Sequence, residues 1–401
     1  VAIVVYKGLK LVVYRMLTNQ ISQINFYNSM QILFITNNFP PIIDGVGDYT
    51  YNIAKQFAEQ NHKVYIVCKQ SPLIDMGISK MTVLPIIKKW DLNCYKPIIK
   101  LIKEKSIDVV SLQYVPHGFH TLGLPFPLIK VTKEIKRCNV KLFTFFHEVS
   151  IEKERGNLKR TILSIIMQYI SKKIIENSDE VATSIEYYKR MISKLDFYKR
   201  DIPLIPIASN IPETTLSNNE IKFLKKKLTP NEEKIISFFG IRNIQTSIDA
   251  INNLKNEGYK IRILIIGKTS KILPHNLPQD TIKTGLLEID KIDKFFKISD
   301  IFILPQDNIY GCSFKSGSFA AGLRNRLPII SAQGKITSEQ LKNEENIIFT
   351  DFNDSRKIKE AIRFLLDNPI IAKEIGDAAY RTAKEFTWHN TYLKYISIIK
   401  K

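Results

Sequence analysis

From Met30 onward, short apolar runs alternate with longer amphipathic ones, and this alternation limits the possible fold more than any other property of the sequence. In the first part of the chain the apolar runs occupy residues 32–36, 64–68, 109–113, 142–146 and 181–184. The amphipathic stretches occupy residues 49–60, 97–105, 128–136, 158–176 and 185–194. Almost continuously apolar strands that alternate with helices are typical of a parallel sheet covered on both faces.

The alternation stops once and then restarts. Pro203, Pro206 and Pro212, followed by the polar residues 214–219, predict a linker. Beyond it, strands are predicted at residues 235–240, 261–267, 301–305, 327–331 and 347–350. Helices are predicted at residues 244–256, 288–298, 318–325, 355–367 and 371–386, and 388–401 reads as a final amphipathic helix. We therefore predict two doubly wound α/β domains in tandem, facing a cleft at the carboxyl ends of their strands.

Charge and cysteine content narrow the function. The 401 residues carry 59 Lys and Arg against 39 Asp and Glu, a net charge of +20, which suggests an anionic partner such as a nucleotide, a nucleic acid or an acidic membrane surface. A scattered basic surface needs no partner, and the absence of a module of interleaved basic and aromatic residues disfavours nucleic acid. The four cysteines show no CxxC spacing and the six histidines no HxxxH or HExxH pattern, so neither a metal site nor a disulfide framework is predicted, and a reducing cytosol fits.

The first 17 residues are apolar but are interrupted by Lys7, Lys10 and Arg15. The uninterrupted apolar run is too short to span a bilayer, and no cleavage site for a signal peptide follows it. One interpretation is a basic amphipathic segment on a membrane surface. The other, which we favour, is that the first domain begins at Met30 and that residues 1–29 are an N-terminal extension.

Residues 301–331 combine a strand, a loop of small residues, a helix and a second strand. Lys315, Ser316, Gly317 and Ser318 lie where the loop meets the helix. The first amides of a helix lack intrahelical partners and the helix dipole favours negative charge, so this junction is a candidate phosphate site. Alternatively, the Ser and Gly residues only cap the helix.

Three further motifs follow predicted strands. Gly45 and Gly47 precede the first predicted helix, where glycine permits positive φ and a close approach to a ligand. The third glycine and the acidic residue of a dinucleotide-binding fingerprint are missing, and this disfavours a dehydrogenase. His147 and Glu148 end a buried strand, where His147 is a candidate for hydrogen bonding or proton transfer, or is a histidine at the edge of the core. Arg242 precedes a helix and suits a diphosphate, or is a solvated loop residue.

Weaker candidates lie in other loops. His117 and His120 follow the predicted strand at residues 109–113 and are less favoured as ligand contacts. Thr284 and Gly285 either border a nucleobase or form a plain turn.

Taken in order, these segments resemble glycosyltransferase family 4. The resemblance is carried by NNFPPIIDGVGDYTYNIAKQFAEQNHKVYIV (37–67), FTFFHEV (143–149), IPIASNIP (205–212) and the donor-site region TGLLEIDKIDKFFKISDIFILPQDNIYGCSFKSGSFAAGLRNRLPIISAQG (284–334). It implies the GT-B fold, with a Rossmann-like acceptor domain at residues 30–212, a donor domain at 213–386 and a final helix at 387–401 that packs back on the first domain.

The resemblance also implies an activity. It implies retaining transfer of a sugar from a UDP- or GDP-linked donor, without a metal or other cofactor, to a glycan or polyprenyl-linked acceptor in cell-surface polysaccharide synthesis. His147 is then the catalytic residue that orients the donor sugar. The expected location is the cytoplasm, with peripheral association at an anionic membrane as a further expectation. The donor would be bound by Gly45, Gly47, Arg242, Ser313, Lys315, Gly317 and Ser318.

The donor loop departs from the usual family pattern. Most members carry two glutamates at positions that correspond to Ser313 and Ala321 here, and the chain has no Glu from residue 289 to 338. The sequence YGCSFKSGSF (310–319) instead resembles a subgroup with a G-x-S-x-[RK]-x-G-S loop, in which Lys315 is the basic residue. The missing glutamates leave open a non-catalytic protein that binds nucleotide sugars as the partner of another transferase. An epimerase would need acid–base carboxylates in the cleft, which the sequence does not show.

Overall fold

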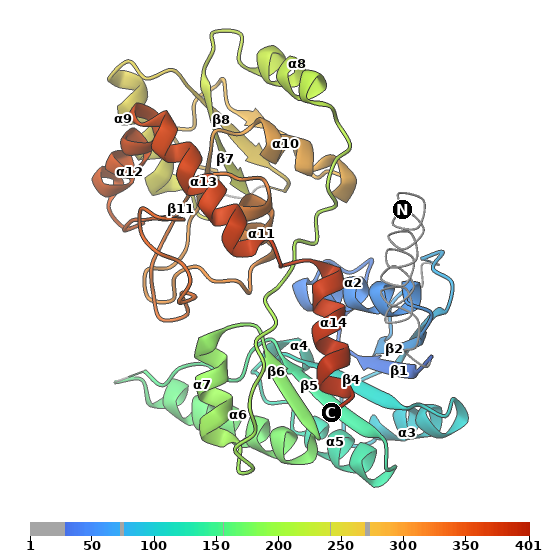
Figure 1. The fold of residues 1–401 in the computed structure, drawn as a ribbon. Helices are drawn as coiled ribbons and strands as arrows, with labels where there is room; N and C mark the ends of the chain where they lie inside the picture. The colour runs from blue at the N-terminus through green and yellow to red at the C-terminus, as the bar shows by residue number, and fades with distance from the viewer. Residues whose placement is uncertain (1–28, 73–75, 155, 241, 269–272) are drawn as a thin grey trace, which may run out of the picture.

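The computed structural model describes residues 29–72, 76–154, 156–240, 242–268 and 273–401. Within these ranges the chain forms two α/β halves, each built on a six-stranded parallel sheet (Figure 1). The extension predicted at residues 1–29 lies outside the described residues except for Ser29. None of the helices in the described ranges combines the length and the apolar character needed to cross a membrane.

The first half contains the sheet that begins at residue 31. Its strands are β1 (Gln31–Ile35), β2 (Lys63–Lys69), β3 (Met81–Ile87), β4 (Val109–Tyr114), β5 (Lys141–Phe146) and β6 (Glu180–Thr183). Its helices are α2 (Gly45–Glu59), α3 (Tyr95–Glu104), α4 (Pro116–Phe119), α5 (Pro127–Arg137), α6 (Leu158–Asn177) and α7 (Glu186–Leu195). The strand order is β3-β2-β1-β4-β5-β6, so the chain changes direction across the sheet between β1 and β4.

Alternate strand residues enter two cores on opposite faces of this sheet. In β1, Leu33 and Ile35 pack with α3, α5, α6 and α7, whereas Ile32 and Phe34 pack with α2. The final helix α14 (Trp388–Ile399) completes the second core through Tyr392, Tyr395 and Ile396. It runs beside α2 in Figure 1, so the C-terminus of the chain lies on the first half.

The second half repeats this arrangement. Its strands are β7 (Lys234–Phe239), β8 (Ile261–Ile266), β9 (Ile282–Lys283), β10 (Ile301–Leu304), β11 (Ile329–Ser331) and β12 (Ile348–Phe349). Its helices are α8 (Asn218–Leu228), α9 (Gln245–Asn256), the 3-10 helix η1 (Ile289–Lys291), α10 (Asp293–Ile298), α11 (Gly317–Arg324), α12 (Ser355–Asp367) and α13 (Pro369–Ala383). The strand order β12-β11-β10-β7-β8-β9 changes direction between β7 and β10.

The predicted parallel architecture is confirmed, and three of the local differences have a structural reason. Strand β3 was missed because it is a half-exposed edge strand that contains Pro85, so it forms no continuous apolar run. Helix α8 begins within the predicted linker, where Ser217 and Glu220 form a capping box, and it was missed because it has no fully buried residue. The helix predicted at residues 288–298 is split into η1 and α10.

Candidate functional site

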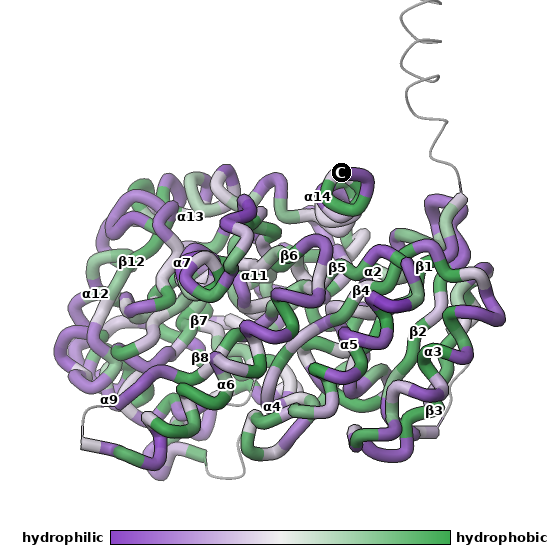
Figure 2. Tube along the Cα trace, turned by 90° about the horizontal axis from the view of Figure 1, so that it is seen from below, coloured by the Kyte–Doolittle hydropathy of each residue, from purple (hydrophilic) through white to green (hydrophobic). Residues whose placement is uncertain are grey.

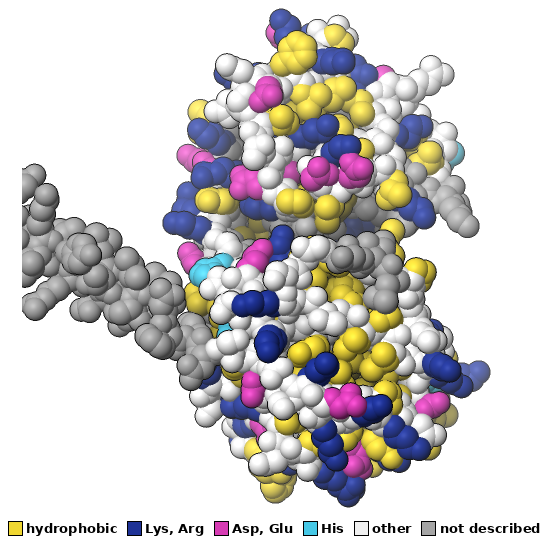
Figure 3. Space-filling model, turned by 90° about the vertical axis from the view of Figure 1, so that its right-hand side faces the viewer, with side chains coloured by type: hydrophobic (Ala, Val, Ile, Leu, Met, Phe, Trp, Pro, Cys, Tyr) yellow, Lys and Arg dark blue, Asp and Glu magenta, His cyan; other side chains and the backbone are white. Residues whose placement is uncertain are grey.

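A pocket with a volume of about 480 Å³ lies where the two halves meet. The space-filling view shows the two lobes joined at a narrow waist, with Lys and Arg scattered over both (Figure 3). The first half contributes the loops that follow β1 and β4, which is the position where an open parallel sheet places its ligand. The second half contributes Lys315 and Gly317, at the start of α11. The lining residues are Asn38, Asp44, Gly45, Val46, Tyr49, Val115, His117, Gly118, His147, Glu148, Ser184, Ile207, Asn210, Lys315 and Gly317.

The predicted glycine loop is the first turn of a helix, which corrects the sequence-based interpretation. Helix α2 begins at Gly45 because the Asp44 side chain caps it, accepting hydrogen bonds from the amides of Val46 (2.9 Å) and Gly47 (2.7 Å). Neither glycine is among the residues with positive φ. Gly47 is needed for packing, since a Cβ there would lie 2.9 Å from the carbonyl oxygen of Asn38, whereas a Cβ at Gly45 would meet open space. The Asp44 carboxylate therefore occupies the helix N-terminus that a phosphate would use.

His147 lies in the wall of the pocket, between two aromatic rings. Its ring centroid is 4.8 Å from that of Tyr49 and 4.7 Å from that of Phe145, both in edge-to-face geometry. Burial, together with the positive charge of Lys315, lowers the pKa of His147 to about 3. The imidazole is therefore neutral at physiological pH.

The neighbours of His147 also determine which ring nitrogen carries its proton. The Gln113 amide donates to the Ser111 hydroxyl (2.8 Å), which leaves the Gln113 carbonyl oxygen 3.1 Å from Nε2 of His147. Because that oxygen can only accept, Nε2 carries the hydrogen and Nδ1 keeps a lone pair. The tyrosine hydroxyls of Tyr395 and Tyr49 continue this buried network, since Tyr395 lies 3.4 Å from Gln113 and 3.2 Å from Tyr49. Through Tyr395, helix α14 therefore contacts the residue whose carbonyl oxygen faces His147.

Replacing Gln113 by leucine tests this positioning role. Without the acceptor, His147 can rotate and change tautomer, so we expect the turnover number to fall about tenfold while the KM for the donor stays within about twofold. Steady-state kinetics measure both quantities. Tyr395→Phe is the matched control, because it removes the 3.4 Å contacts with Gln113 and the 3.2 Å contact with Tyr49 but leaves the acceptor of His147 in place, and it should change turnover by less than about twofold. Equal losses in the two variants would indicate a general packing defect instead.

Lys315 reaches across the boundary between the halves. Its ammonium group lies 3.0 Å from a carboxylate oxygen of Glu148 and 3.1 Å from the hydroxyl of Tyr188. Burial alone would lower the pKa of Lys315, but Tyr188 and the negative charge of Glu148 raise it well above its ordinary value. Lys315 is therefore a fixed positive charge at the pocket.

The start of α11, next to Lys315, forms the rest of the pocket wall that the second half contributes. Ser316 caps the helix by accepting from the amide of Phe319 (3.3 Å), and Gly317 faces the Asn210 side chain, whose amide nitrogen would lie 3.7 Å from a Cβ at Gly317. The Asn210 carbonyl oxygen is buried and has no hydrogen-bond partner among the described residues. Ser318 follows in the first turn of α11 but does not line the pocket.

Besides Ser318, three predicted donor residues do not line this pocket, namely Gly47, Ser313 and Arg242. Ser313 is 2% exposed and does not line the pocket. Arg242 lines a separate cavity of about 350 Å³ between the ends of β7 and β10, where the second sheet changes direction. Burial lowers the pKa of Arg242, and neither its Nε nor the hydroxyl of Ser247 in the same cavity has a hydrogen-bond partner among the described residues. This cavity also adjoins the start of α9, so its polar groups are suited to an anion.

Of the weaker candidates, one lines the pocket and two have structural roles in their own loops. His117 lines the pocket between the halves, whereas Nδ1 of His120 accepts from the amides of Leu122 (3.2 Å) and Leu124 (3.4 Å) and stabilises its own loop. The Thr284 hydroxyl accepts from the amide of Gly267 (2.9 Å), which makes it part of a turn beside β8. Within the described ranges, no three His, Cys, Asp or Glu side chains are grouped so that they could hold a metal ion.

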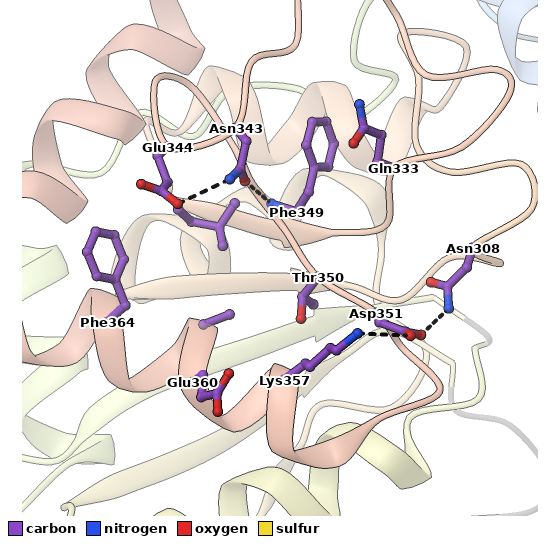
Figure 4. A pocket seen from close by; sticks show the side chains of 12 residues that line it. Asn308, Gln333, Asn343, Glu344, Phe349, Thr350, Asp351, Lys357, Glu360 and Phe364 are labelled. Carbon is purple, nitrogen blue, oxygen red and sulfur yellow. Dashed lines mark hydrogen bonds and ion pairs between the residues drawn. The ribbon is translucent and has the colours of Figure 1, made fainter.

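A larger cavity, of about 710 Å³, lies at the outer edge of the second sheet between β12 and α12 (Figure 4). Its Asp351 pairs with Lys357 and with Asn308, and its Glu344 accepts from Asn343. None of the residues that the sequence singled out lines this cavity. The pocket between the halves is therefore the better candidate for the reaction site.

Sequence reasoning missed several residues of the site. Gln113 lies inside an apolar strand, Tyr188 belongs to no motif, and Asn210 lies in the segment IPIASNIP (205–212) but was not singled out. Of the missed residues, only Asp44 could have been predicted from the sequence, because an Asp directly before a helix is a common N-cap.

Two facing α/β halves with a pocket at the carboxyl ends of their strands define the GT-B class. The first half matches the model of Glycosyltransferase Family 4 over residues 43–208, and the second matches that of Glycosyl transferases group 1 over residues 220–382. By these matches the chain is a glycosyltransferase with the GT-B fold.

Solved structures share this fold over almost the whole chain. A glycosyltransferase from Rickettsia africae is 17% identical with a TM-score of 0.67, covering 93% of this chain and 98% of its own. HepE of Anabaena, in complex with UDP and glucose, is 10% identical with a TM-score of 0.67, covering 92% and 99%. WaaG, a glycosyltransferase involved in lipopolysaccharide biosynthesis, is 11% identical with a TM-score of 0.64, covering 92% and 99%. No curated protein matches the sequence.

Proposed function

We propose that this enzyme transfers a sugar, with retention of configuration and without a metal ion, from a UDP- or GDP-linked donor to a glycan or polyprenyl-linked acceptor in cell-surface polysaccharide synthesis. One observation carries the proposal. A single pocket has a neutral, oriented His147 on one wall, and Lys315 and the start of α11 on the other. His147 can accept a hydrogen bond from a sugar hydroxyl on one side of the pocket, and Lys315 and the start of α11 can bind phosphate on the other side.

The donor would lie along the carboxyl edge of the second sheet. Its diphosphate would accept hydrogen bonds from the first amides of α11, beside the fixed positive charge of Lys315. Arg242 and the Ser247 hydroxyl, which has no hydrogen-bond partner within the described ranges, would hold the part of the donor that extends to the neighbouring cavity. The donor would therefore connect two cavities that are separate in this structure.

The pocket also favours a particular course of reaction. Its two carboxylates are already engaged, since Asp44 caps α2 and Glu148 pairs with Lys315, so neither is a free nucleophile. In our proposal the bond between the anomeric carbon and the phosphate oxygen breaks while the acceptor oxygen bonds to the same face of that carbon. The acceptor's proton passes to the leaving phosphate oxygen. Lys315 and the α11 amides would stabilise the charge on the leaving group, and Nδ1 of His147 would accept a hydroxyl hydrogen of the donor sugar.

The solved relatives suggest the substrate class. HepE was solved with UDP and glucose, and WaaG acts in lipopolysaccharide biosynthesis. We extend the same class of donor and acceptor to this enzyme as a proposal. We also propose that the loop YGCSFKSGSF places the chain in the subgroup with a basic residue at the position of Lys315.

A second candidate is a non-catalytic partner of another transferase that binds nucleotide sugars. It is favoured by Ser313 and Ala321, which are both buried and carry no carboxylate where the resemblance expects glutamates. The two candidates differ in product formation. We expect incubation with a panel of nucleotide sugars and polyprenyl-linked acceptors to release UDP or GDP from one donor, measured by a coupled nucleotide assay. Tight binding of a nucleotide sugar without release, across all acceptors, would support the partner role instead.

A further inference from the structure

Helix α6 carries an apolar stripe on its outer side. Leu158, Ile162, Ile165 and Tyr169 are spaced by four, three and four residues, which places them on one face of a helix. They are between 48% and 72% exposed. The opposite side of α6 packs into the core of the first half through Ile170, Ile174 and Ile175, and Met167 on that side is buried as well. The exposed stripe is therefore additional to the side that stabilises the fold.

The loop before α5 lies against the other side of α6. Its Gly123 approaches the buried Met167, since a Cβ there would be 3.0 Å from the terminal carbon of Met167. The loop therefore leaves the exposed stripe uncovered. We call the four exposed side chains of α6 (Leu158, Ile162, Ile165 and Tyr169) the α6 face. Helices α5 and α6 lie on the side of the first half that is seen from below (Figure 2).

The charges around the α6 face are predominantly basic. Helices α5 and α6 each carry four Lys or Arg residues and one Glu. Lys133, Lys159 and Lys172 are exposed, and Lys173 lies 5.9 Å from the ring of Tyr169. Apolar side chains bordered by exposed lysines match the interface of an anionic bilayer, where the apolar groups enter the acyl boundary and the lysines contact the headgroups.

Helix α6 also lies close to the pocket between the halves, because Gly123 lies between Met167 of α6 and His117. The same Cβ position at Gly123 lies 3.0 Å from Nε2 of His117, which lines that pocket. We propose that the α6 face docks on the surface of an anionic lipid bilayer and so brings the pocket to a lipid-linked acceptor. This inference rests on the proposed transferase function for its purpose, but the docking itself can be measured independently.

The test compares binding of the full chain to vesicles. We expect the protein to sediment with vesicles of phosphatidylglycerol and phosphatidylcholine, and to bind at least about tenfold more weakly to vesicles of phosphatidylcholine alone. The triple variant Ile162→Ser, Ile165→Ser and Tyr169→Ser should lose at least about tenfold in its partition coefficient on the anionic vesicles. Because these side chains are exposed, its UDP or GDP release with a soluble acceptor and its melting temperature should stay close to those of the unmodified protein.

Exposed apolar residues elsewhere provide the matched control. Phe223 on α8 is 73% exposed and Ile370 on α13 is 74% exposed, so a variant with Phe223→Ser and Ile370→Ser should keep vesicle binding within about twofold. Equal loss in both variants would show nonspecific apolar adsorption and would overturn the proposal.

Three further outcomes would overturn the proposal. One is no binding to anionic vesicles. Another is full binding by the triple variant, which would assign docking to another part of the chain. The third is a dimer in light scattering that the triple variant converts to monomer with vesicle binding unchanged, which would make the α6 face an interface between copies. Failure of the proposed function is distinguishable, because nucleotide release with a soluble acceptor does not depend on vesicles.

Discussion

Replacing His147 by alanine is expected to lower the turnover number by a factor of about 100 to 1,000. The same change should alter the dissociation constant for UDP or GDP by less than about twofold. The reason is position, because His147 lies on the wall formed by the first half, whereas the phosphate-binding groups Lys315 and Gly317 lie on the other. An interaction with the donor sugar that strengthens as the glycosidic bond breaks contributes to turnover rather than to nucleotide affinity.

Turnover and nucleotide binding are measured separately, by product formation at saturating donor and by calorimetry. His389→Ala is a suitable control, because His389 is exposed on α14, and it should leave both values unchanged. If His147→Ala turned over as fast as the unmodified enzyme, His147 would have no part in the mechanism. A large loss of nucleotide affinity would instead place His147 among the phosphate-binding groups.

The pH dependence of turnover provides a second check on His147. Its pKa of about 3 lies below the ordinary value near 6.5, so the folded enzyme does not protonate the ring when the pH falls through 6.5. We expect no ionisation of His147 in the turnover profile between about pH 5 and pH 9. The unfolded chain does protonate His147 as the pH falls through about 6.5, whereas the folded enzyme does so only near pH 3. The free energy of unfolding should therefore decrease as the pH falls from about 6.5 toward 3. An activity limb near pH 6.5 that disappears in His147→Asn would contradict the neutral ring.

The fold could be predicted because its signal is continuous along the chain. Strands such as β1 and β5 are buried on both faces, and burial on both faces requires unbroken apolar runs that the sequence displays directly. Strand β3 and helix α8 were not predicted, because each is partly exposed and lacks a clear apolar pattern. Their stability depends on neighbours that are distant in sequence, which a local pattern does not contain.

The site could be predicted only where a motif coincided with the end of a strand or the start of a helix. His147 directly follows β5, Lys315 and Gly317 lie at the start of α11, and all three line one pocket. Gly45 and Gly47 were correctly associated with a helix start, but the positive φ expected there is wrong, because the Asp44 side chain caps an ordinary helical turn. Their contact with a donor stays a prediction. Gln113 could not have been found, since its importance comes from the contact with His147, 34 residues later in the chain.

Replacing Lys315 by methionine is expected to weaken binding of UDP or GDP by about tenfold to a hundredfold. Methionine keeps the apolar stem but removes the fixed charge that we place beside the diphosphate. Because Lys315 is also bound to Glu148, the phosphate must share it with a carboxylate in this arrangement. We therefore expect Glu148→Gln to have the opposite effect, tightening nucleotide binding by about twofold to fivefold.

Calorimetric titration of both variants with the same nucleotide at two salt concentrations measures these effects. The interaction with Lys315 should weaken as salt rises, because part of its side chain is open to solvent, and that dependence should be smaller in Lys315→Met. Lys335→Met is the control, since Lys335 also pairs across the halves, with Glu152 at 2.5 Å, but does not line the pocket. Equal losses for Lys315 and Lys335 would indicate that the ion pairs only hold the halves together. If neither Lys315→Met nor Arg242→Ala weakened binding, the assignment of the donor site to this cleft would be wrong.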